Sequence, residues 1–126
     1  MSFYMVKKST ESTPYVLIDE KNHCMTLEGM SFHENTVEFF HEIVAWLGGY
    51  LETDFTTFTF DCKMKYFNSS TTKILFDMFE LMNEHCVDDK EIVVNWNVNK
   101  EDEMLIELCD DIKDDYDNLT VNLIMI

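Results

Sequence analysis

The period of the hydrophobic pattern changes between residues 64 and 74, and this change is the clearest signal in the chain. From Thr56 to Met64, hydrophobic and polar residues alternate, which is typical of a strand with one buried face. From Ile74 onward, hydrophobic residues recur every three or four positions, which predicts a helix that ends near Cys86. The sequence therefore predicts a strand, a tight turn and a helix in direct succession.

The other segments show the same two periods. Strand patterns occur at 15–19, 23–28, 91–98 and 119–126, and helical patterns occur at about 35–51 and 100–114. Residues 1–14 contain only a short apolar piece, Phe3 to Val6, and a polar loop. We expect the buried stripes of the first and third helices to be Val37, Phe40, Val44, Leu47 and Leu51, and Met104, Leu105, Leu108, Cys109 and Ile112.

Three details of these elements are also predicted. Gly29 should end the second strand, and the continuous apolar run at 91–98 suggests a strand buried on both faces. Two glycines cost a helix about 2 kcal/mol relative to alanine, so Gly48 and Gly49 should loosen the end of the first helix unless tertiary packing holds it.

The order β-β-α-β-α-β-α-β predicts an α/β fold. Strands that alternate with helices imply right-handed crossovers and a mixed, mainly parallel sheet packed by helices, with the first hairpin as its antiparallel pair. At 126 residues, with 46% hydrophobic residues, three glycines and one proline, we expect residues 1–126 to form a single domain.

Composition excludes several classes of partner. Nine lysines, no arginine and 25 acidic residues give a net charge of −16, which disfavours binding to nucleic acid or to an anionic membrane surface. The chain has no apolar run typical of a signal peptide or a membrane span, and its four scattered cysteines suggest reduced, mostly buried thiols. These features predict a cytoplasmic protein.

The predicted turn carries the most suggestive chemistry. Asn68 is followed by four hydroxyl residues, 69–72, at the carboxyl end of a strand, where functional residues gather in sheets of this kind. A helix N-terminus favours a hydroxyl cap or a phosphate, and one cap needs only one residue. The turn is therefore a cap alone or a cap with a phosphate acceptor, and the nearby Lys63, Lys65 and Lys73 favour the acceptor modestly.

No other group of residues predicts a cofactor, a metal site or catalysis. His23–Cys24 and His85–Cys86 lack metal-ligand spacing, and the acidic residues between Asp110 and Asp117 lack the pattern of a calcium loop. That acidic group is best interpreted as a solvated face, or second as a docking surface. Ser69 has neither a nucleophile elbow nor a nearby histidine, so we predict no enzyme activity.

Several motifs together resemble the SiaC family of bacterial regulatory phosphoproteins. The motifs are Tyr66 to Ser70 with Lys73, Thr10 to Pro14, Glu34–Asn35 with Phe39, Trp46–Leu47 and Val94 to Trp96, and their order and spacing cover nearly the whole chain. The resemblance implies a fold similar to STAS domains. It also implies phosphorylation of a hydroxyl at the turn by a partner serine/threonine kinase and dephosphorylation by a PP2C-type phosphatase.

Carried onto this chain, the resemblance makes Ser69 the phosphate acceptor, with Asn68, Ser70 and Lys73 shaping the turn and contacting the partner. In that family the unphosphorylated form binds and activates a diguanylate cyclase, which implies a role in cyclic di-GMP signalling and biofilm formation. The chain departs from the family at Ser69, where threonine is commoner, and at His33, where proline often stands before Glu34–Asn35. An anti-sigma-factor antagonist and, less favoured, a small hydrolase that uses Ser69 are the alternatives.

Overall fold

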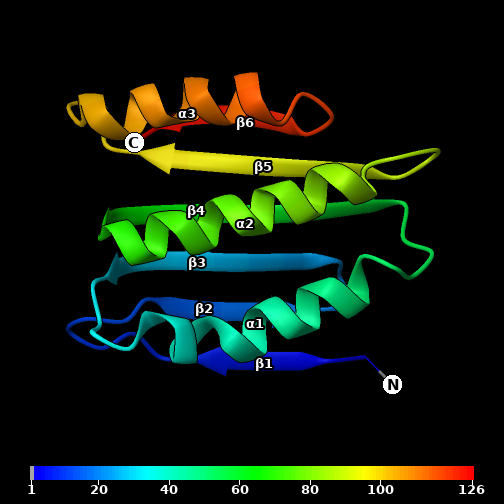
Figure 1. The fold of residues 1–126 in the computed structure, drawn as a ribbon, viewed down its shortest axis with the longest axis horizontal. Helices are drawn as coiled ribbons and strands as arrows, with labels where there is room; N and C mark the ends of the chain where they lie inside the picture. The colour runs from blue at the N-terminus through cyan, green and yellow to red at the C-terminus, as the bar shows by residue number, and fades with distance from the viewer. Residues whose placement is uncertain (1) are drawn as a thin grey trace.

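A computed structural model describes residues 2–126 and contains six strands and three helices (Figure 1). In chain order these are β1 (Tyr4–Lys7), β2 (Tyr15–Asp19), β3 (Cys24–Ser31), α1 (Thr36–Tyr50), β4 (Thr57–Phe67), α2 (Ser69–His85), β5 (Glu91–Val98), α3 (Glu103–Asp115) and β6 (Thr120–Met125). All eight predicted elements are present, and β1 is an additional strand.

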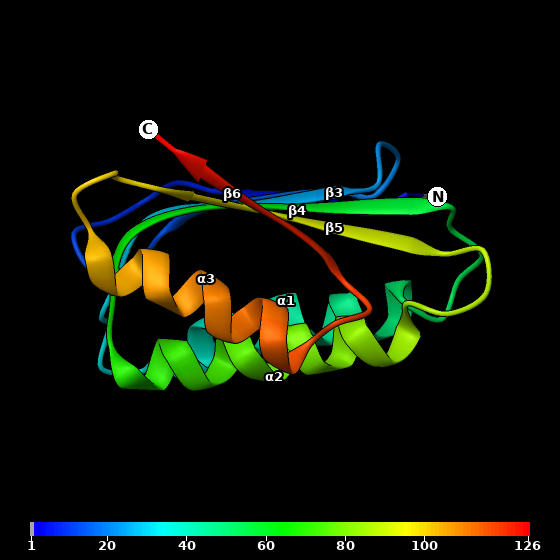
Figure 2. The ribbon, with the colours of Figure 1, turned by 90° about the horizontal axis from the view of Figure 1, so that it is seen from above.

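The six strands form one sheet in sequential order, β1 to β6. The pairs β1–β2 and β2–β3 are antiparallel, whereas β3–β4, β4–β5 and β5–β6 are parallel. Because each crossover of the same hand advances the sheet by one strand in the same direction, all three helices lie on one face (Figure 2). The predicted α/β architecture with a mixed, mainly parallel sheet is confirmed.

The hydrophobic core fills the space between the sheet and the helices. Alternate residues of β4, from Phe58 to Met64, are buried against the helices, as the two-residue period predicts. Trp96 on β5 is only 1% exposed, and its Nε1–H donates to the carbonyl of Leu105, 2.9 Å away. The hydrogen bond satisfies the polar atom of a large buried side chain.

Two predicted core residues are instead exposed. Val37 is 70% exposed, because α1 turns Thr36, Phe40 and Ile43 towards the sheet and Val37 lies about 100° around the helix from Thr36. Met104 is 82% exposed, because α3 begins at Glu103 and places Met104 beside the buried stripe. The sequence pattern located both helices but included one flanking residue in each stripe.

The strands also differ from the predictions in their ends and burial. β3 does not end at Gly29, which adopts a φ of +114° within the strand; the pairing then shifts, so that Lys65 on β4 has no partner on β3. The unpaired Lys65 makes this a β-bulge of β4, and Gly29 lies opposite it on β3, where its positive φ is accessible to glycine. On the helix side of β5, Ile92, Val94, Trp96 and Val98 are all buried. On the other face, which no helix covers, Val93 and Asn95 are only half-buried and Asn97 alone is buried.

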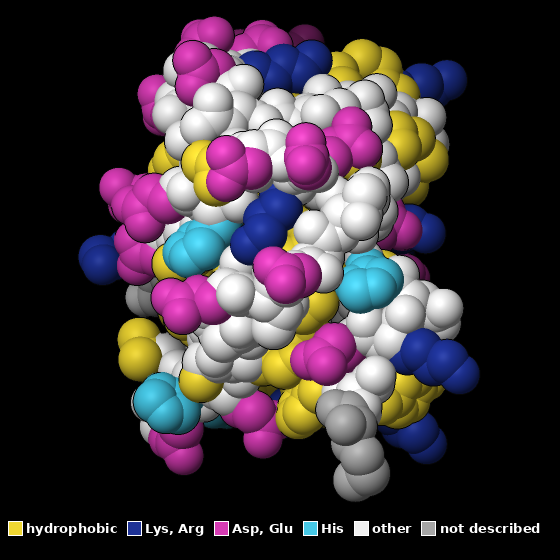
Figure 3. Space-filling model, turned by 90° about the vertical axis from the view of Figure 1, so that its right-hand side faces the viewer, with side chains coloured by type: hydrophobic (Ala, Val, Ile, Leu, Met, Phe, Trp, Pro, Cys, Tyr) yellow, Lys and Arg dark blue, Asp and Glu magenta, His cyan; other side chains and the backbone are white. Residues whose placement is uncertain are grey.

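The net charge of −16 is reflected in exposed acidic side chains. Figure 3 shows the end opposite to the turn between β4 and α2, where acidic side chains are scattered among polar ones. All four cysteines are free; Cys62 and Cys109 are buried and the other two are half-buried, as predicted. None of the helices within residues 2–126 has the length and apolar character needed to cross a membrane.

Candidate functional site

The turn between β4 and α2 lies at the carboxyl end of the parallel strands (Figure 1). β4 ends at Phe67 and α2 begins at Ser69, so that Asn68 alone makes the turn. The N–H of Asn68 donates to the carbonyl of Ser31 on β3, 3.0 Å away. The start of α2 is therefore fixed to the sheet by a backbone hydrogen bond.

Asn68 is the N-cap of α2. Its Oδ1 accepts from the backbone N–H of Thr71 at 2.9 Å and lies 2.9 Å from the Thr71 hydroxyl oxygen. Because the cap satisfies one of the unpaired N–H groups of the first helical turn, it stabilises this end of the helix by about 1 kcal/mol.

Two of the four hydroxyls hold the turn together. Thr71 is completely buried, and its hydroxyl oxygen lies 2.8 Å from the hydroxyl oxygen of Ser31 and 3.2 Å from the Ser31 carbonyl oxygen. The hydroxyl of Thr72 donates to the carbonyl of Asn68 at 3.0 Å. Neither hydroxyl is free for chemistry without disrupting the helix N-terminus.

The other two hydroxyls point to solvent. Ser69 and Ser70 are exposed, and their hydroxyls form no hydrogen bond with any residue between 2 and 126. Both residues lie in the first turn, whose backbone N–H groups have no acceptor within the helix. An anion on either hydroxyl would therefore meet unpaired donors and the positive end of the helix dipole.

The lysines near the turn differ in their availability. Lys73 lies one helical turn after Ser69; its side chain is 80% exposed and pairs with Asp77 at 3.5 Å. Lys63 lies 3.8 Å from Asp61, and Lys65 is exposed at the bulge of β4. Exposed ion pairs contribute little to stability, so Lys73 can leave Asp77 for another anion at small cost.

Ser70 and Lys73 also line a groove between α1 and α2. The groove has a volume of about 460 Å³, and its lining residues are Val37, Phe40, His41, Val44, Ala45, Ser70, Lys73, Ile74 and Asp77. Most of them are apolar, and Val37 stands exposed at the amino-terminal end of α1. The exposed hydroxyls of the turn thus adjoin an apolar groove, which the sequence did not predict because it placed Val37 in the core.

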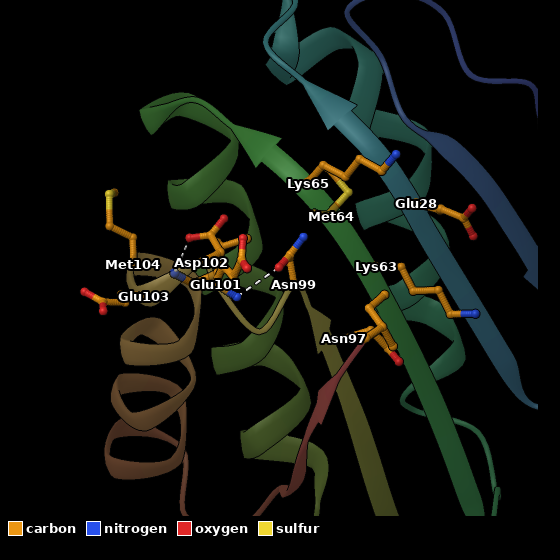
Figure 4. Close-up of a pocket in the computed structure, with 12 residues that line it drawn as sticks. Glu28, Lys63, Met64, Lys65, Asn97, Asn99, Glu101, Asp102, Glu103 and Met104 are labelled. Atoms are coloured by element: carbon orange, nitrogen blue, oxygen red, sulfur yellow. Dashed lines mark hydrogen bonds between the residues drawn. The ribbon is translucent and has the colours of Figure 1, made fainter.

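A second hollow, of about 930 Å³, opens where β4 and β5 separate beyond the paired residues Cys62 and Trp96 (Figure 4). Many of its polar groups already have partners. Asn99 Oδ1 accepts from the N–H of Glu101 at 2.9 Å, and Asp102 Oδ1 accepts from the N–H of Leu105 at 3.1 Å. These bonds shape the start of α3.

Metal and nucleophilic chemistry find little support in the residues described. Within residues 2–126, no group of three histidine, cysteine or acidic side chains is arranged to hold a metal ion. Among these residues, no histidine forms a hydrogen bond with Ser69 or Ser70. Burial raises the pKa of the Cys62 thiol far above its ordinary value, so this thiol stays protonated and unreactive.

Comparison with known proteins identifies relatives along almost the whole chain. The family model of SiaC family regulatory phosphoproteins matches residues 7–126. An uncharacterized protein of Pseudomonas aeruginosa strain UCBPP-PA14 is 24% identical over 106 residues, which is 84% of each chain.

Two solved structures share the fold. Apo-SiaC from Pseudomonas aeruginosa superposes with a TM-score of 0.88 at 20% identity, over 97% of this chain and 98% of that one. SiaC in the complex of the Pseudomonas aeruginosa diguanylate cyclase SiaD with its activator SiaC gives a TM-score of 0.90 at 21% identity, over 97% and 99% of the two chains.

Proposed function

The chain belongs to the SiaC family of regulatory phosphoproteins, and on this basis we propose that it is a signalling switch phosphorylated on Ser69. It is a regulatory protein rather than an enzyme. The proposal is carried by one observation: the turn at the start of α2 exposes the Ser69 hydroxyl but buries or bonds those of Thr71 and Thr72.

Ser69 is the acceptor that fits the geometry best. A kinase must reach the hydroxyl and align it with the transferred phosphoryl group, which requires an exposed side chain without competing hydrogen bonds. Thr71 fails this requirement because it is completely buried. Ser70 is also exposed, but it faces the α1–α2 groove, whereas Ser69 follows the N-cap directly at the edge of the turn.

The phosphorylated turn would be stabilised locally. Phosphate adds about −1.5 to −2 charges and three acceptor oxygens. The unpaired N–H groups of Ser69 and Ser70 and the dipole of α2 favour an anion there. The ammonium of Lys73, one turn away, can leave its exposed pair with Asp77 and approach the phosphate.

A partner serine/threonine kinase would add the phosphate, and a PP2C-type phosphatase would remove it, within the cytoplasm. Ser replaces the commoner Thr of the family at this position. Serine and threonine both carry a hydroxyl on Cβ, so a serine/threonine kinase should accept Ser69.

The proposed target of the unphosphorylated form is a diguanylate cyclase, which the chain would bind and activate. The support is the family membership and the structure of Pseudomonas aeruginosa SiaD with its activator SiaC. We propose that the cyclase docks over the turn and the adjoining α1–α2 groove. Ser70 and Lys73 would contact it there, and Asn68 would hold the turn in shape.

Phosphosite mapping tests the acceptor assignment. The protein is produced in its native host as wild type, Ser69→Ala and Ser70→Ala, and phosphate is located by mass spectrometry. We expect phosphate on Ser69 in the wild type and in Ser70→Ala, and none in Ser69→Ala. Full phosphate incorporation in Ser69→Ala, mapped to Ser70 or Thr72, would contradict the assignment.

Binding tests the target. The unphosphorylated protein should bind and activate a diguanylate cyclase of the same organism, and should not bind its anti-sigma factors. Binding to an anti-sigma factor, with no effect on any cyclase, would replace this target by that of an anti-sigma-factor antagonist.

A further inference from the structure

The two edges of the sheet are built very differently. The β1 edge is only four residues long and is followed by Lys8. Lys7 on the same edge lies 3.9 Å from Glu42 and 5.3 Å from the centre of the Phe39 ring. Short strands and lysines are the usual means by which proteins keep a sheet edge from pairing with other chains.

The β6 edge has none of this protection. Residues 118–126, Asn-Leu-Thr-Val-Asn-Leu-Ile-Met-Ile, contain no charged residue, although 27% of the chain is charged. They contain no proline either, and they are rich in residues with high β-propensity. Ile124, Met125 and Ile126 are 37%, 53% and 70% exposed. Such an edge is suited to pairing with another strand.

The backbone groups that would pair can be identified. The N–H of Ile126 donates to the carbonyl of Val98 on β5, so the even-numbered residues of this segment face β5. Because successive residues of a strand point their N–H and C=O groups to opposite sides, Val121, Leu123 and Met125 present theirs outward.

Nothing within residues 2–126 covers these outward groups. β6 pairs with β5 alone and ends the sheet. Figure 2 looks onto this edge, with β6 in front of the other strands and α3 below it. Six residues at about 3.3 Å each give an edge about 20 Å long, which matches one extended segment of about six residues.

The acidic residues beside the β6 edge disfavour a second copy of this chain as the strand that pairs with it. α3 packs against β6, and residues 100–117 contain nine acidic residues and two lysines. A second copy paired antiparallel to β6 would place its own α3, with the same acidic residues, on the same face and next to the first. Two chains of net charge −16 would then repel each other at close range.

We propose that the β6 edge is a docking site for an extended, basic segment of a protein partner, which adds a seventh strand to the sheet. Its backbone pairs with Val121, Leu123 and Met125, and its lysine or arginine side chains lie near the acidic residues of α3. This site is separate from the turn at Ser69 and does not depend on the proposed phosphorylation.

A synthetic peptide that alternates threonine and valine between terminal lysines is the probe. It is titrated into the isotopically labelled full chain and followed by amide NMR. We expect the amide signals of Val121, Leu123 and Met125 to shift and to gain protection from hydrogen exchange. A matched peptide with glutamates in place of the lysines should bind at least about tenfold more weakly at low salt.

Met125→Pro is the test variant, and Met125→Ala is its control. Both variants remove the exposed methionine side chain, but only Met125→Pro removes the outward backbone N–H. The hydrogen bonds between β6 and β5 stay in place in both variants, because residue 125 points its N–H away from β5. Met125→Pro should bind the basic peptide about fivefold to tenfold more weakly than Met125→Ala, as the loss of one hydrogen bond predicts. Ser69→Asp should bind the peptide like the wild type.

Four outcomes would overturn the proposal in whole or in part. The first is no change at the three amides with up to millimolar basic peptide. The second is equal binding of the acidic peptide, which would remove the role of α3. The third is self-association of the wild type that Met125→Pro abolishes, which would make a second copy the occupant. If Ser69→Asp alone abolished peptide binding, the site would not be separate from the turn.

Discussion

At the scale of single residues, four adjacent hydroxyls perform different tasks. Thr71 and Thr72 bond to the turn and to β3, whereas Ser69 and Ser70 remain exposed at the start of α2. The difference follows from which face of α2 each residue occupies: the side chain of Thr71 lies against Ser31 on β3, while its backbone N–H donates to the cap, Asn68. Position in the first turn therefore separates structural hydroxyls from a candidate acceptor.

Replacing Thr71 tests this division. Thr71→Val keeps the shape of the side chain but leaves the buried hydroxyl of Ser31 without its partner. We expect a loss of about 1–3 kcal/mol in the free energy of unfolding, because an unsatisfied buried polar group is costly. Ser70→Ala removes an exposed hydroxyl and should change the free energy of unfolding by less than about 0.5 kcal/mol. Urea denaturation measures both, and equal effects would show that Thr71 is not structural.

The cap itself gives a second residue-scale prediction. Asn68→Ala removes the acceptor for the N–H of Thr71 and should destabilise the protein by about 1 kcal/mol. The variant should also be a poorer kinase substrate, because the turn that presents Ser69 loses its anchor. Unchanged stability together with an unchanged phosphorylation rate would contradict the role assigned to Asn68.

At the scale of elements, side chains of the central strands form much of the core that packs against the helices. Trp96→Ala removes a side chain that is 1% exposed and should cost about 3–5 kcal/mol. Met104→Ala is the control, since Met104 is 82% exposed and should be nearly neutral. A urea midpoint for Trp96→Ala that equals the control would mean that β5 does not pack as described.

The α1–α2 groove can be tested without damaging either helix. Val37→Asp places a carboxylate in the first turn of α1, where the helix dipole favours it, so stability should not fall. Cyclase affinity should fall by about tenfold, because the introduced carboxylate would have to lose its water of hydration in a mostly apolar interface. Val87→Asp, at another exposed valine outside the groove, should leave the affinity unchanged. Calorimetry that shows no difference between the two variants would remove the groove from the docking surface.

The sequence predicted the elements well where the hydrophobic period is long and unbroken. The change of period between Met64 and Ile74 located β4 and α2, and the exposure of Ser69 followed from its place at the helix N-terminus. The turn is shorter than predicted, because β4 extends to Phe67 and the four hydroxyls lie within α2. β1 was missed because four residues are too few to establish a period. The contact between Ser31 and Thr71 joins residues 40 positions apart, which no local pattern reports.

At the scale of the whole molecule, charge and topology divide the surface. The helices cover one face of the sheet, the turn lies at the carboxyl ends of the parallel strands, and acidic side chains are spread over the opposite end (Figures 1 and 3). The chain has no arginine and few lysines with which to neutralise an added phosphate at an interface. Phosphorylation of Ser69 should therefore affect association much more than folding.

The most direct test compares melting temperature and cyclase affinity for three forms of the protein: unmodified, phosphorylated on Ser69, and Ser69→Asp. Phosphorylation should change the free energy of unfolding by no more than about 1 kcal/mol, because the start of α2 accepts an anion. It should weaken cyclase binding by about a hundredfold or more, because a doubly charged group would have to be desolvated at the interface. Ser69→Asp carries one charge and should show a smaller loss. Unfolding of the phosphorylated domain, or an affinity that phosphorylation leaves unchanged, would contradict the account.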